Sequence, residues 1–264
     1  MNSDFSSRTE LLLGRRVMEA LAECRVIVFG VGGVGGWCVE ALARTGVGHL
    51  TMVDPDCVAA SNINRQVMAT LTTVGQPKAE MMRRRVLDIN PAMEVDARIA
   101  GYTALTADDF DLDAYDYVID AIDSLPDKAL LIRRACLSRA KLFSSMGAAR
   151  KTDPRRVEVA EFWKVKGCPL AAALRRLFKR QGLYPARRFS CVFSAELHDN
   201  LGAAYNDEHL AAAAGGRHAG LPNGTLVQAT ATFGLVLASL LVADVERRCR
   251  EQEGPIPQAS SPGV

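Results

Sequence analysis

A glycine-rich turn near the N-terminus has the spacing of a phosphate-binding loop. The stretch RVIVFGVGGVGGWCVEAL, residues 25–42, places Gly30, Gly32 and Gly35 directly after a short apolar run. The first glycine permits a tight turn, the second lets the backbone approach a phosphate, and the third lets helix and strand pack closely. The start of the following helix offers free N–H groups to an anion. We therefore expect a nucleotide site at Gly30, Gly32, Gly33 and Gly35, with tight packing alone as the alternative.

The first acid after this turn suits a ribose. Asp54 ends a second apolar stretch, residues 49–54. A carboxylate at this point of a strand–turn–helix unit accepts hydrogen bonds from ribose hydroxyls. Because NAD and ATP both carry an adenosine ribose, these two motifs leave both nucleotides open.

A group of cations and amides after Asp54 favours ATP. The segments SNINRQ and VGQPKAE supply Asn62, Arg65, Gln66 and Lys78. A hydride-transfer enzyme needs few extra cations here, because the phosphates of its cofactor lie on the glycine loop. Cations beside a reacting phosphate stabilise a displacement at phosphorus. For each cation taken singly, the alternative is a solvated surface charge.

Two carboxylates end a later apolar stretch, YVIDAIDS. They are Asp120 and Asp123. In open parallel sheets, ligands bind beyond the carboxyl ends of the strands, and a carboxylate there can hold Mg²⁺ that bridges phosphates. We predict that both acids line the nucleotide site and that Asp123 is the metal ligand. A role for Asp123 in capping the next helix is the alternative, and the two roles are compatible.

These motifs lie on alternating predicted strands and helices. Apolar runs predict strands at residues 25–29 and 49–54, one ending near Asp120, and one beginning the segment 141–147. Helical spacing is found at residues 10–23, 35–44, 78–89 and 128–140. This alternation predicts an α/β fold with a doubly wound, mostly parallel, Rossmann-like sheet and a C-terminal extension.

We expect one domain over residues 1–250. Residues 1–147 would form its nucleotide-binding half, and residues 148–250 a basic substrate-binding half that ends in a helix. Residues 251–264 are predicted to be a disordered tail, because EQEGPIPQASSPGV has few apolar side chains.

Composition and the N-terminus indicate a cytoplasmic globular protein. The 264 residues are 48% hydrophobic and 23% charged, with a net charge of +2. The first residues lack the pattern of a secretion signal. Residues 229–243 are apolar but shorter than the roughly 20 residues of a membrane span, so we expect a buried helix, with membrane association as the alternative. The seven cysteines include no C-x-x-C pair, and no zinc is expected.

The second half of the chain contains a strongly basic segment. Residues 150–188 hold twelve Lys or Arg and three acids, a net +9. This excess suits RNA phosphates, and the candidate contacts are Arg175, Arg176, Lys179, Arg180, Arg187 and Arg188. Aromatic side chains among the cations could stack a base, although core packing is the preferred interpretation for them: Phe162, Trp163, Phe178, Tyr184 and Phe189. Cys191, in a strand-like run, is expected to be a small core residue rather than a nucleophile.

The ordered motifs resemble a known enzyme family. GVGGVGG, the VD at Asp54, NINRQ, GQPKAE, INP and DAIDS are similar to those of the activating enzymes (ThiF/MoeB-like) for ubiquitin, molybdopterin synthase and thiamine sulfur. The resemblance implies adenylation of a carboxylate with MgATP, ribose binding by Asp54 and Mg²⁺ at Asp123. It also implies phosphate contacts by Asn62, Arg65, Gln66 and Lys78. A homodimer is implied too, in which an N-terminal arginine, here Arg8 in RTELLLG, crosses into the partner's site; a surface arginine at a helix start is the alternative.

Further motifs narrow the resemblance to one branch. RTELLLG, RTGVG, VIDAIDS, CPLAAALRR, CVFSAE and TATFG are similar to the tRNA threonylcarbamoyladenosine dehydratase branch. That resemblance implies ATP-dependent ring closure of a modified adenosine in the anticodon loop of tRNA. ATP and Mg²⁺ are implied, with a monovalent cation and sulfur-relay proteins as additional candidates. Two alternatives are adenylation of a ubiquitin-like sulfur carrier, whose activators usually have zinc cysteines, and an NAD-binding oxidoreductase or regulatory nucleotide-binding module.

Overall fold

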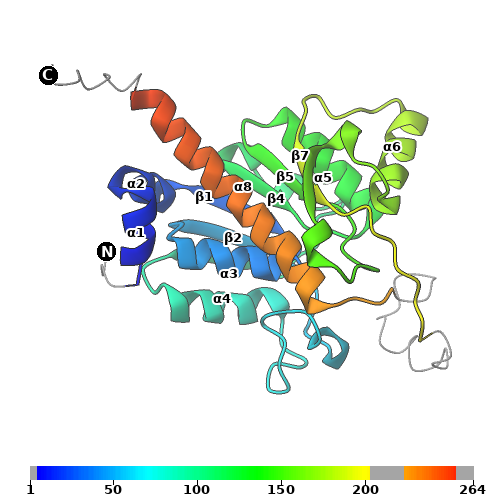
Figure 1. Cartoon of the computed structure of the whole chain (residues 1–264), viewed down its shortest axis with the longest axis horizontal. Coiled ribbons are helices and arrows are strands. Elements are labelled where there is room, and N and C mark those ends of the chain that lie inside the picture. Colours follow the sequence, from blue (N-terminus) through cyan, green and yellow to red (C-terminus); the bar gives the residue numbers. More distant parts are fainter. Residues whose placement is uncertain (1–4, 203–222, 254–264) are drawn as a thin grey trace, which may run out of the picture.

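A seven-stranded sheet organises the chain, and the computed structural model describes residues 5–202 and 223–253 of it. The strand order is β3-β2-β1-β4-β5-β7-β6, and β6 alone among the strands of the described residues runs antiparallel to its neighbour (Figure 1). The strands are β1 (Arg25–Phe29), β2 (His49–Val53), β3 (Glu94–Arg98), β4 (Tyr117–Asp120), β5 (Lys141–Ser145), β6 (Glu158–Glu161) and β7 (Ser190–Phe193). The predicted doubly wound, mostly parallel sheet is confirmed.

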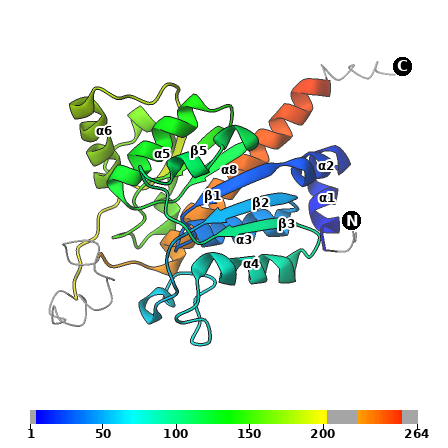
Figure 2. The same cartoon turned by 180° about the vertical axis from the view of Figure 1, so that it is seen from behind.

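Helices cover both faces of this sheet (Figure 2). They are α1 (Ser7–Leu13), α2 (Arg15–Glu23), α3 (Gly35–Thr45), α4 (Lys78–Ile89), α5 (Leu125–Leu137), α6 (Pro169–Gln181) and α8 (Val227–Glu253). Successive strand residues point to opposite faces. Accordingly, Val26 and Val28 join one core with α2, α3, α4 and α8, and Ile27 and Phe29 join the other with α5 and α6. Burial on both faces explains why β1 is apolar after its first residue.

Several element boundaries differ from the sequence-based expectation. The helix predicted over residues 10–23 is two helices, because Gly14 adopts φ +81° and breaks the helical path. The helix predicted from Lys128 already begins at Leu125. β3 escaped prediction, because Glu94, Asp96 and Arg98 make this edge strand polar on one face.

The domain division remains a prediction. β5 and β7 pair in parallel, so one sheet runs across the expected boundary at residue 147. Of the predicted tail, residues 251–253 continue α8, and residues 254–264 lie outside the described residues.

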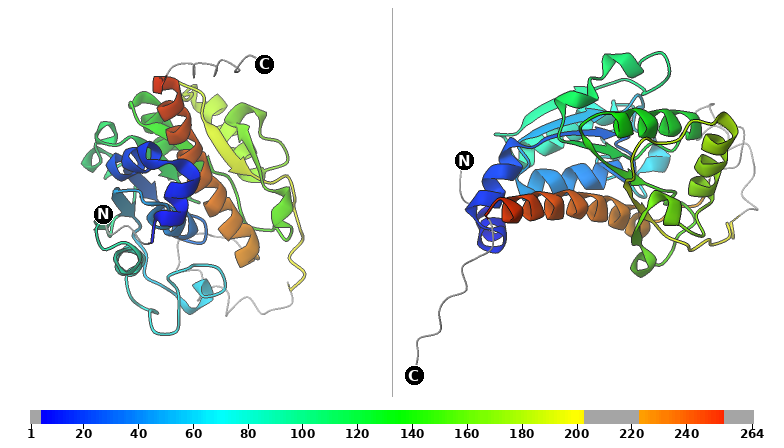
Figure 3. Two further views of the ribbon diagram at one scale, coloured as in Figure 1. Left: turned by 60° about the vertical axis from the view of Figure 1, so that its left-hand side comes forward. Right: turned by 90° about the horizontal axis from the view of Figure 1, so that it is seen from above.

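The long helix α8 is a core helix of the first face. Phe233, Leu237 and Leu241 are fully buried in that core. Gly234 allows α8 to approach the first turn of α3 closely, since a Cβ there would lie 2.4 Å from the Val34 carbonyl oxygen. By length and composition alone, residues 227–252 would also suffice to cross a membrane. Figure 3 shows α8 lying along the molecule, beside α3.

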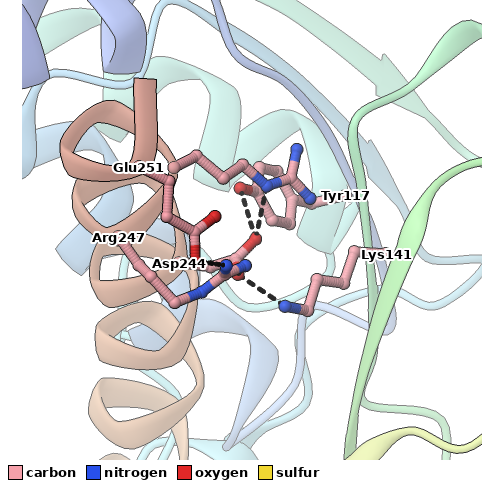
Figure 4. A network of polar contacts seen from close by, with 6 residues as sticks. Tyr117, Lys141, Asp244, Arg247 and Glu251 are labelled. Carbon is pink, nitrogen blue, oxygen red and sulfur yellow. Dashed lines mark hydrogen bonds and ion pairs between the residues drawn. The ribbon is translucent and has the colours of Figure 1, made fainter. Parts of the chain in front are cut away.

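A buried carboxylate fastens the C-terminal half of α8 to the sheet (Figure 4). Asp244 accepts hydrogen bonds from Lys141 Nζ at 2.5 Å and from the Tyr117 hydroxyl at 3.0 Å. Arg247 and Arg248 contact the same carboxylate at 2.7 and 2.9 Å. Burial alone would raise the pKa of Asp244, but the hydrogen bonds from Lys141, Arg247 and Tyr117 outweigh it and hold that pKa at about 2. Because Tyr117 and Lys141 begin their strands, this anchor lies at the amino ends of the sheet.

Candidate nucleotide site

The glycine loop between β1 and α3 contains glycines of two kinds. Gly30 adopts φ +84°, and a Cβ there would lie 2.8 Å from the Ala121 carbonyl oxygen. A Cβ on Gly35 would lie 1.8 Å from the Gly30 carbonyl oxygen, so both positions are closed by packing. At Gly32, by contrast, the nearest heavy atom to an added Cβ is Gln66 Nε2, at 3.7 Å. Packing therefore explains Gly30 and Gly35, whereas a Cβ at Gly32 would fit in ordinary van der Waals contact with Gln66.

Asp54 is fixed against this loop. Its buried carboxylate accepts hydrogen bonds from the Val31 N–H at 2.8 Å and from the Asp56 N–H at 3.0 Å. Burial raises the pKa of Asp54, and the charge of Lys78 and these two backbone bonds oppose the rise. The predicted ribose acid thus lies at the carboxyl end of β2, next to the glycine loop at the carboxyl end of β1.

The segment after β2 folds back over the loop. A Cβ on Gly33 would lie 3.1 Å from Arg65 Cγ, and the Trp37 indole N–H donates to the Arg65 carbonyl oxygen at 3.0 Å. Asn62 is buried, and its Oδ1 accepts from the Ala59 N–H at 3.0 Å in the short helix Ala60–Asn62. Arg65 and Gln66 are therefore held as a pair against the glycines.

Gln66 carries an unsatisfied polar atom. The residue is 6% exposed, and its Oε1 has no hydrogen-bond partner within the described residues. Buried polar atoms without a partner are rare and need an explanation. A bound hydroxyl or amino group would supply the missing donor, and the Gln66 Nε2 beside Gly32 is the donor that a phosphate would need.

Lys78 approaches the same site from the start of α4. Its ammonium is nearly buried and lies 2.9 Å from Asp56 Oδ2. Two backbone contacts hold α4 against the segment after β2. The Lys78 N–H donates to the Asp56 carbonyl oxygen at 2.9 Å, and Cys57 and Pro77 form an isolated antiparallel β-bridge. The sequence-based reasoning missed Asp56, although its position two residues beyond Asp54 in VDPD is a recognisable signal.

Asp123 faces Arg65 across the site. It is exposed in the turn between β4 and α5. Burial lowers the pKa of Arg65, and the nearby charge of Asp123 opposes that change. The Asp123 carboxylate and the Arg65 guanidinium thus both lie beyond the carboxyl ends of the parallel strands, where ligands of such sheets bind.

The carboxylate of Asp120, in contrast, is already bound by other groups of the protein. The residue is fully buried, and its carboxylate lies 2.8 Å from Lys128 Nζ, accepts from Ser144 Oγ at 2.6 Å and accepts from the Ile122 N–H at 3.1 Å. Sequence reasoning missed Lys128, which a helix pattern does not distinguish from a surface lysine. Cys191 is also fully buried in this region, and burial raises the pKa of its thiol well above the usual range while the charge of Lys128 opposes the rise.

Arg8 lies apart from these residues. It is exposed on α1, which leads through α2 into the start of β1. The glycine loop follows the other end of β1, and Figure 1 shows α1 at the end of the molecule where β1 begins. The described chain therefore does not bring Arg8 together with its own Lys78 and Arg65.

Two cations of the basic segment are bound by backbone carbonyl groups. Arg175 donates to the Phe162 carbonyl oxygen at 3.2 Å, and Arg187 donates to the Ala135 carbonyl oxygen at 2.8 Å. Arg175 is half-buried, whereas Arg187 is exposed, as are the other candidate RNA contacts: Arg176, Lys179, Arg180 and Arg188. Of the five aromatics, three are core residues: Phe162, Phe178 and Phe189. Trp163 and Tyr184 are exposed, at 42% and 55%.

Comparison with known proteins agrees with this arrangement. The ThiF family model matches residues 6–245. The tRNA threonylcarbamoyladenosine dehydratase of Bacillus subtilis is 44% identical over 191 residues, which are 72% of this chain and 74% of that one. The molybdopterin-synthase adenylyltransferase of Escherichia coli is 35% identical over 173 residues, 62% of this chain and 64% of that one.

Solved structures extend the likeness to nearly the whole chain. The E. coli tRNA N6-threonylcarbamoyladenosine dehydratase TcdA, in complex with ATP, aligns with a TM-score of 0.82 and 32% identity, covering 95% of this chain and 97% of that one. It has also been solved with AMP. These matches confirm the fold and the resemblance to the dehydratase branch, and the chain belongs to the ThiF family.

Proposed function

We propose that this protein dehydrates N6-threonylcarbamoyladenosine in the anticodon loop of tRNA, at the expense of ATP. The observation that carries the proposal is the placement of two cations at the glycine loop: Arg65 lies against Gly33, and the charge of Lys78 acts on the ribose acid Asp54. With Asp123 nearby, these cations suit a nucleotide whose phosphates react. The dehydratases among the relatives and the ATP and AMP complexes of TcdA support the same activity.

The chemistry needs no protein nucleophile. A carboxylate oxygen of the threonyl group attacks the α-phosphorus of ATP, and the bond to pyrophosphate breaks. A nitrogen or oxygen of the same side chain then attacks the acyl carbon, AMP leaves with the former carboxylate oxygen, and the attacking group loses its proton. The substrate has lost one water. Because the second attack is intramolecular, proximity supplies much of its rate.

Each site residue has a role in this scheme. Asp54 binds the ribose, and the backbone N–H groups of the glycine loop hold the phosphates together with the side-chain amide N–H groups of Asn62 and Gln66. Arg65 and Lys78 stabilise the charge that develops on the phosphates. Asp123 would hold Mg²⁺, which neutralises phosphate charge when it is bound. Asp120, occupied by Lys128 and Ser144, acts by positioning the turn that carries Asp123.

A homodimer completes the site. Arg8 lies at the opposite end of its own chain from the glycine loop, which suits delivery to a partner's site. Leu11 and Leu12 on the same helix are 85% and 82% exposed. Apolar side chains so exposed beside a functional arginine support a protein contact at α1.

A cytoplasmic location fits these roles. ATP and tRNA are cytoplasmic substrates, and the apolar side chains of α8 that face the sheet are buried in the core. We therefore assign α8 to the folded domain rather than to a membrane.

Product analysis tests the activity. The protein is incubated with MgATP and either threonylcarbamoyl-modified tRNA or a ubiquitin-like sulfur carrier, and AMP and pyrophosphate are followed. Release that depends on the modified tRNA supports the proposal. Release that depends on the carrier alone would assign the chain to the carrier-activating class.

A further inference from the structure

Trp163 and Tyr184 form an exposed aromatic pair beside α6. Their ring centroids lie 6.0 Å apart with an interplanar angle of 47°. Trp163 and the buried Phe162 ring pack edge-to-face with centroids 5.0 Å apart, so the indole is held against the core. Neither the indole N–H nor the phenol hydroxyl makes a hydrogen bond within the described residues. Two large aromatic rings thus lie exposed beside each other, and their polar atoms make no hydrogen bond within the described residues.

Cations are frequent in the chain around this pair. The nearest acid in the sequence is Glu161, whose Oε2 accepts from the Trp163 backbone N–H at 3.1 Å. Residues 164–188 contain no Asp or Glu. Leu174 and Phe178 turn inward on α6, which places Arg176, Lys179 and Arg180 on its outer face. Within the described chain these three make no ion pair, whereas Arg150 and Arg155 of the same basic segment pair with Asp199 and Asp153. Lys164 and Lys166 are exposed next to Trp163.

This surface lies toward the nucleotide end of the molecule. α6 is at the end opposite α1 in Figure 1 and in the right-hand view of Figure 3. β1 starts beside α2 and runs away from it. The glycine loop, which follows the carboxyl end of β1, therefore lies toward the end of the molecule that carries α6 and away from the end that carries α1. An RNA held on α6 can therefore extend toward the glycine loop.

We propose that Trp163 and Tyr184 stack an unpaired base of the tRNA substrate, while Arg176, Lys179 and Arg180 bind the neighbouring phosphates. Base stacking on aromatic rings combined with a cationic track is how proteins bind single-stranded RNA, and the anticodon loop presents unpaired bases. This inference rests on the proposed function, because it takes tRNA to be the substrate.

The charges argue against a second copy of this chain as the occupant. In a two-fold dimer with this patch at the axis, the patch faces its own copy. Arg176, Lys179 and Arg180 would then meet their own counterparts without an acid between residues 164 and 188 to compensate. A polyanion removes this repulsion.

The test separates ring stacking from charge. Affinity for modified tRNA is measured against salt concentration for Trp163→Ala, Tyr184→Ala and the ring-retaining Trp163→Phe and Tyr184→Phe. Each Ala variant is expected to bind about tenfold more weakly with an unchanged salt slope, whereas the Phe variants bind nearly normally. Replacing Arg176, Lys179 and Arg180 together by Ala should lower the salt slope by about 2. Leu137→Ala, an exposed apolar control on α5, should bind like the wild type.

Fluorescence supplies a direct signature of stacking. The chain has two tryptophans, Trp37 and Trp163. Single-stranded RNA should quench the emission, a duplex of equal length should quench it less, and Trp163→Phe should remove the difference. Stacking is overturned if the Phe variants bind as weakly as the Ala variants, or if the Ala variants bind and react like the wild type. It is equally overturned if the Ala variants change only the oligomeric state in light scattering. If the wild type binds tRNA with quenching yet forms no AMP, the proposed function fails while the stacking surface stands.

Discussion

The ammonium of Lys128 lies 2.8 Å from the carboxylate of Asp120, and both side chains are fully buried. Lys128 also donates to the Ile122 carbonyl oxygen at 3.0 Å, and Asp120 accepts from the Ile122 N–H. The pair therefore fixes the turn after β4 from both sides. This turn carries Asp123, and its Ala121 carbonyl packs against Gly30. One ion pair thus positions the metal-ligand candidate relative to the glycine loop.

Removing the cation of this pair should destabilise the fold strongly. Lys128→Met leaves the Asp120 charge buried without its partner, and we expect a loss of about 3 kcal/mol or more in the free energy of unfolding. Urea denaturation measures it. Arg133→Met on the same helix is the matched control, since Arg133 makes no ion pair within the described residues, and should cost less than about 1 kcal/mol. Equal losses in the two variants would show that the buried pair does not stabilise this turn.

Substitutions in the glycine loop should separate ligand binding from packing. Gly32→Ala meets no atom closer than 3.7 Å, so the protein should keep its melting temperature while ATP binds at least about tenfold more weakly. Gly35→Ala would place its Cβ 1.8 Å from a backbone oxygen and should prevent normal folding. Calorimetric melting and ATP titration give both quantities. Normal ATP affinity in Gly32→Ala would remove this glycine from the phosphate site.

Loss of the Lys78 charge should act on catalysis. Lys78→Met removes a cation placed to stabilise the reacting phosphates, and we expect AMP formation to fall by about 100-fold. Arg84→Met on the exposed side of the same helix is the control and should retain nearly full activity. A Lys78→Met enzyme as active as the Arg84→Met enzyme would contradict a role for Lys78 in the reaction.

The anchor of α8 should respond to acid. The folded-state pKa of Asp244, about 2, lies below its usual value near 4, so its ion pairs stabilise the fold above pH 4 and this contribution disappears as the pH falls toward 2. Asp244→Asn should lose about 2 kcal/mol at neutral pH and show a flatter decline of stability between pH 4 and pH 2.

Denaturation curves at several pH values test the anchor. Asp96→Asn, which removes a half-exposed partner of Arg98, should change stability by less than about 0.5 kcal/mol. An acid profile of Asp244→Asn parallel to that of the wild type would show that Asp244 is not the titrating anchor.

Mixing variants should show which protomer uses Arg8. Arg8→Ala and Lys78→Met should each be nearly inactive alone. If Arg8 serves the partner's site, a mixed dimer has one complete site, and random mixing should restore about a quarter of wild-type activity. No recovery, with exchange of subunits verified by mass spectrometry, would place Arg8 in its own chain's site or outside the reaction.

Much of the fold could be predicted because its elements are locally encoded. β1 is apolar beyond its first residue since both faces of the sheet are covered, and Gly30 and Gly35 mark a turn that only glycine fits. β3 was missed because an edge strand with one polar face resembles a loop. The break at Gly14 was missed since the helical spacing of apolar residues continues across it.

The site was predictable as a set of residues, but their partners were not. Asp54, Arg65, Gln66 and Lys78 follow from motif order, and the parallel topology brings them together. Sequence alone does not show that Asp120 forms an ion pair with Lys128, since burial of a lysine depends on tertiary packing. Likewise, composition could not separate Trp163 and Tyr184 on the surface from Phe162 in the core.

The most direct measurement follows the modified nucleoside itself. The purified protein is incubated with MgATP and threonylcarbamoyl-modified tRNA, the tRNA is digested to nucleosides, and mass spectrometry is combined with AMP quantification. We expect one AMP and one pyrophosphate for each nucleoside that loses a water, and no AMP with tRNA lacking the modification. An unchanged nucleoside, or AMP formed only with a sulfur-carrier protein, would contradict it.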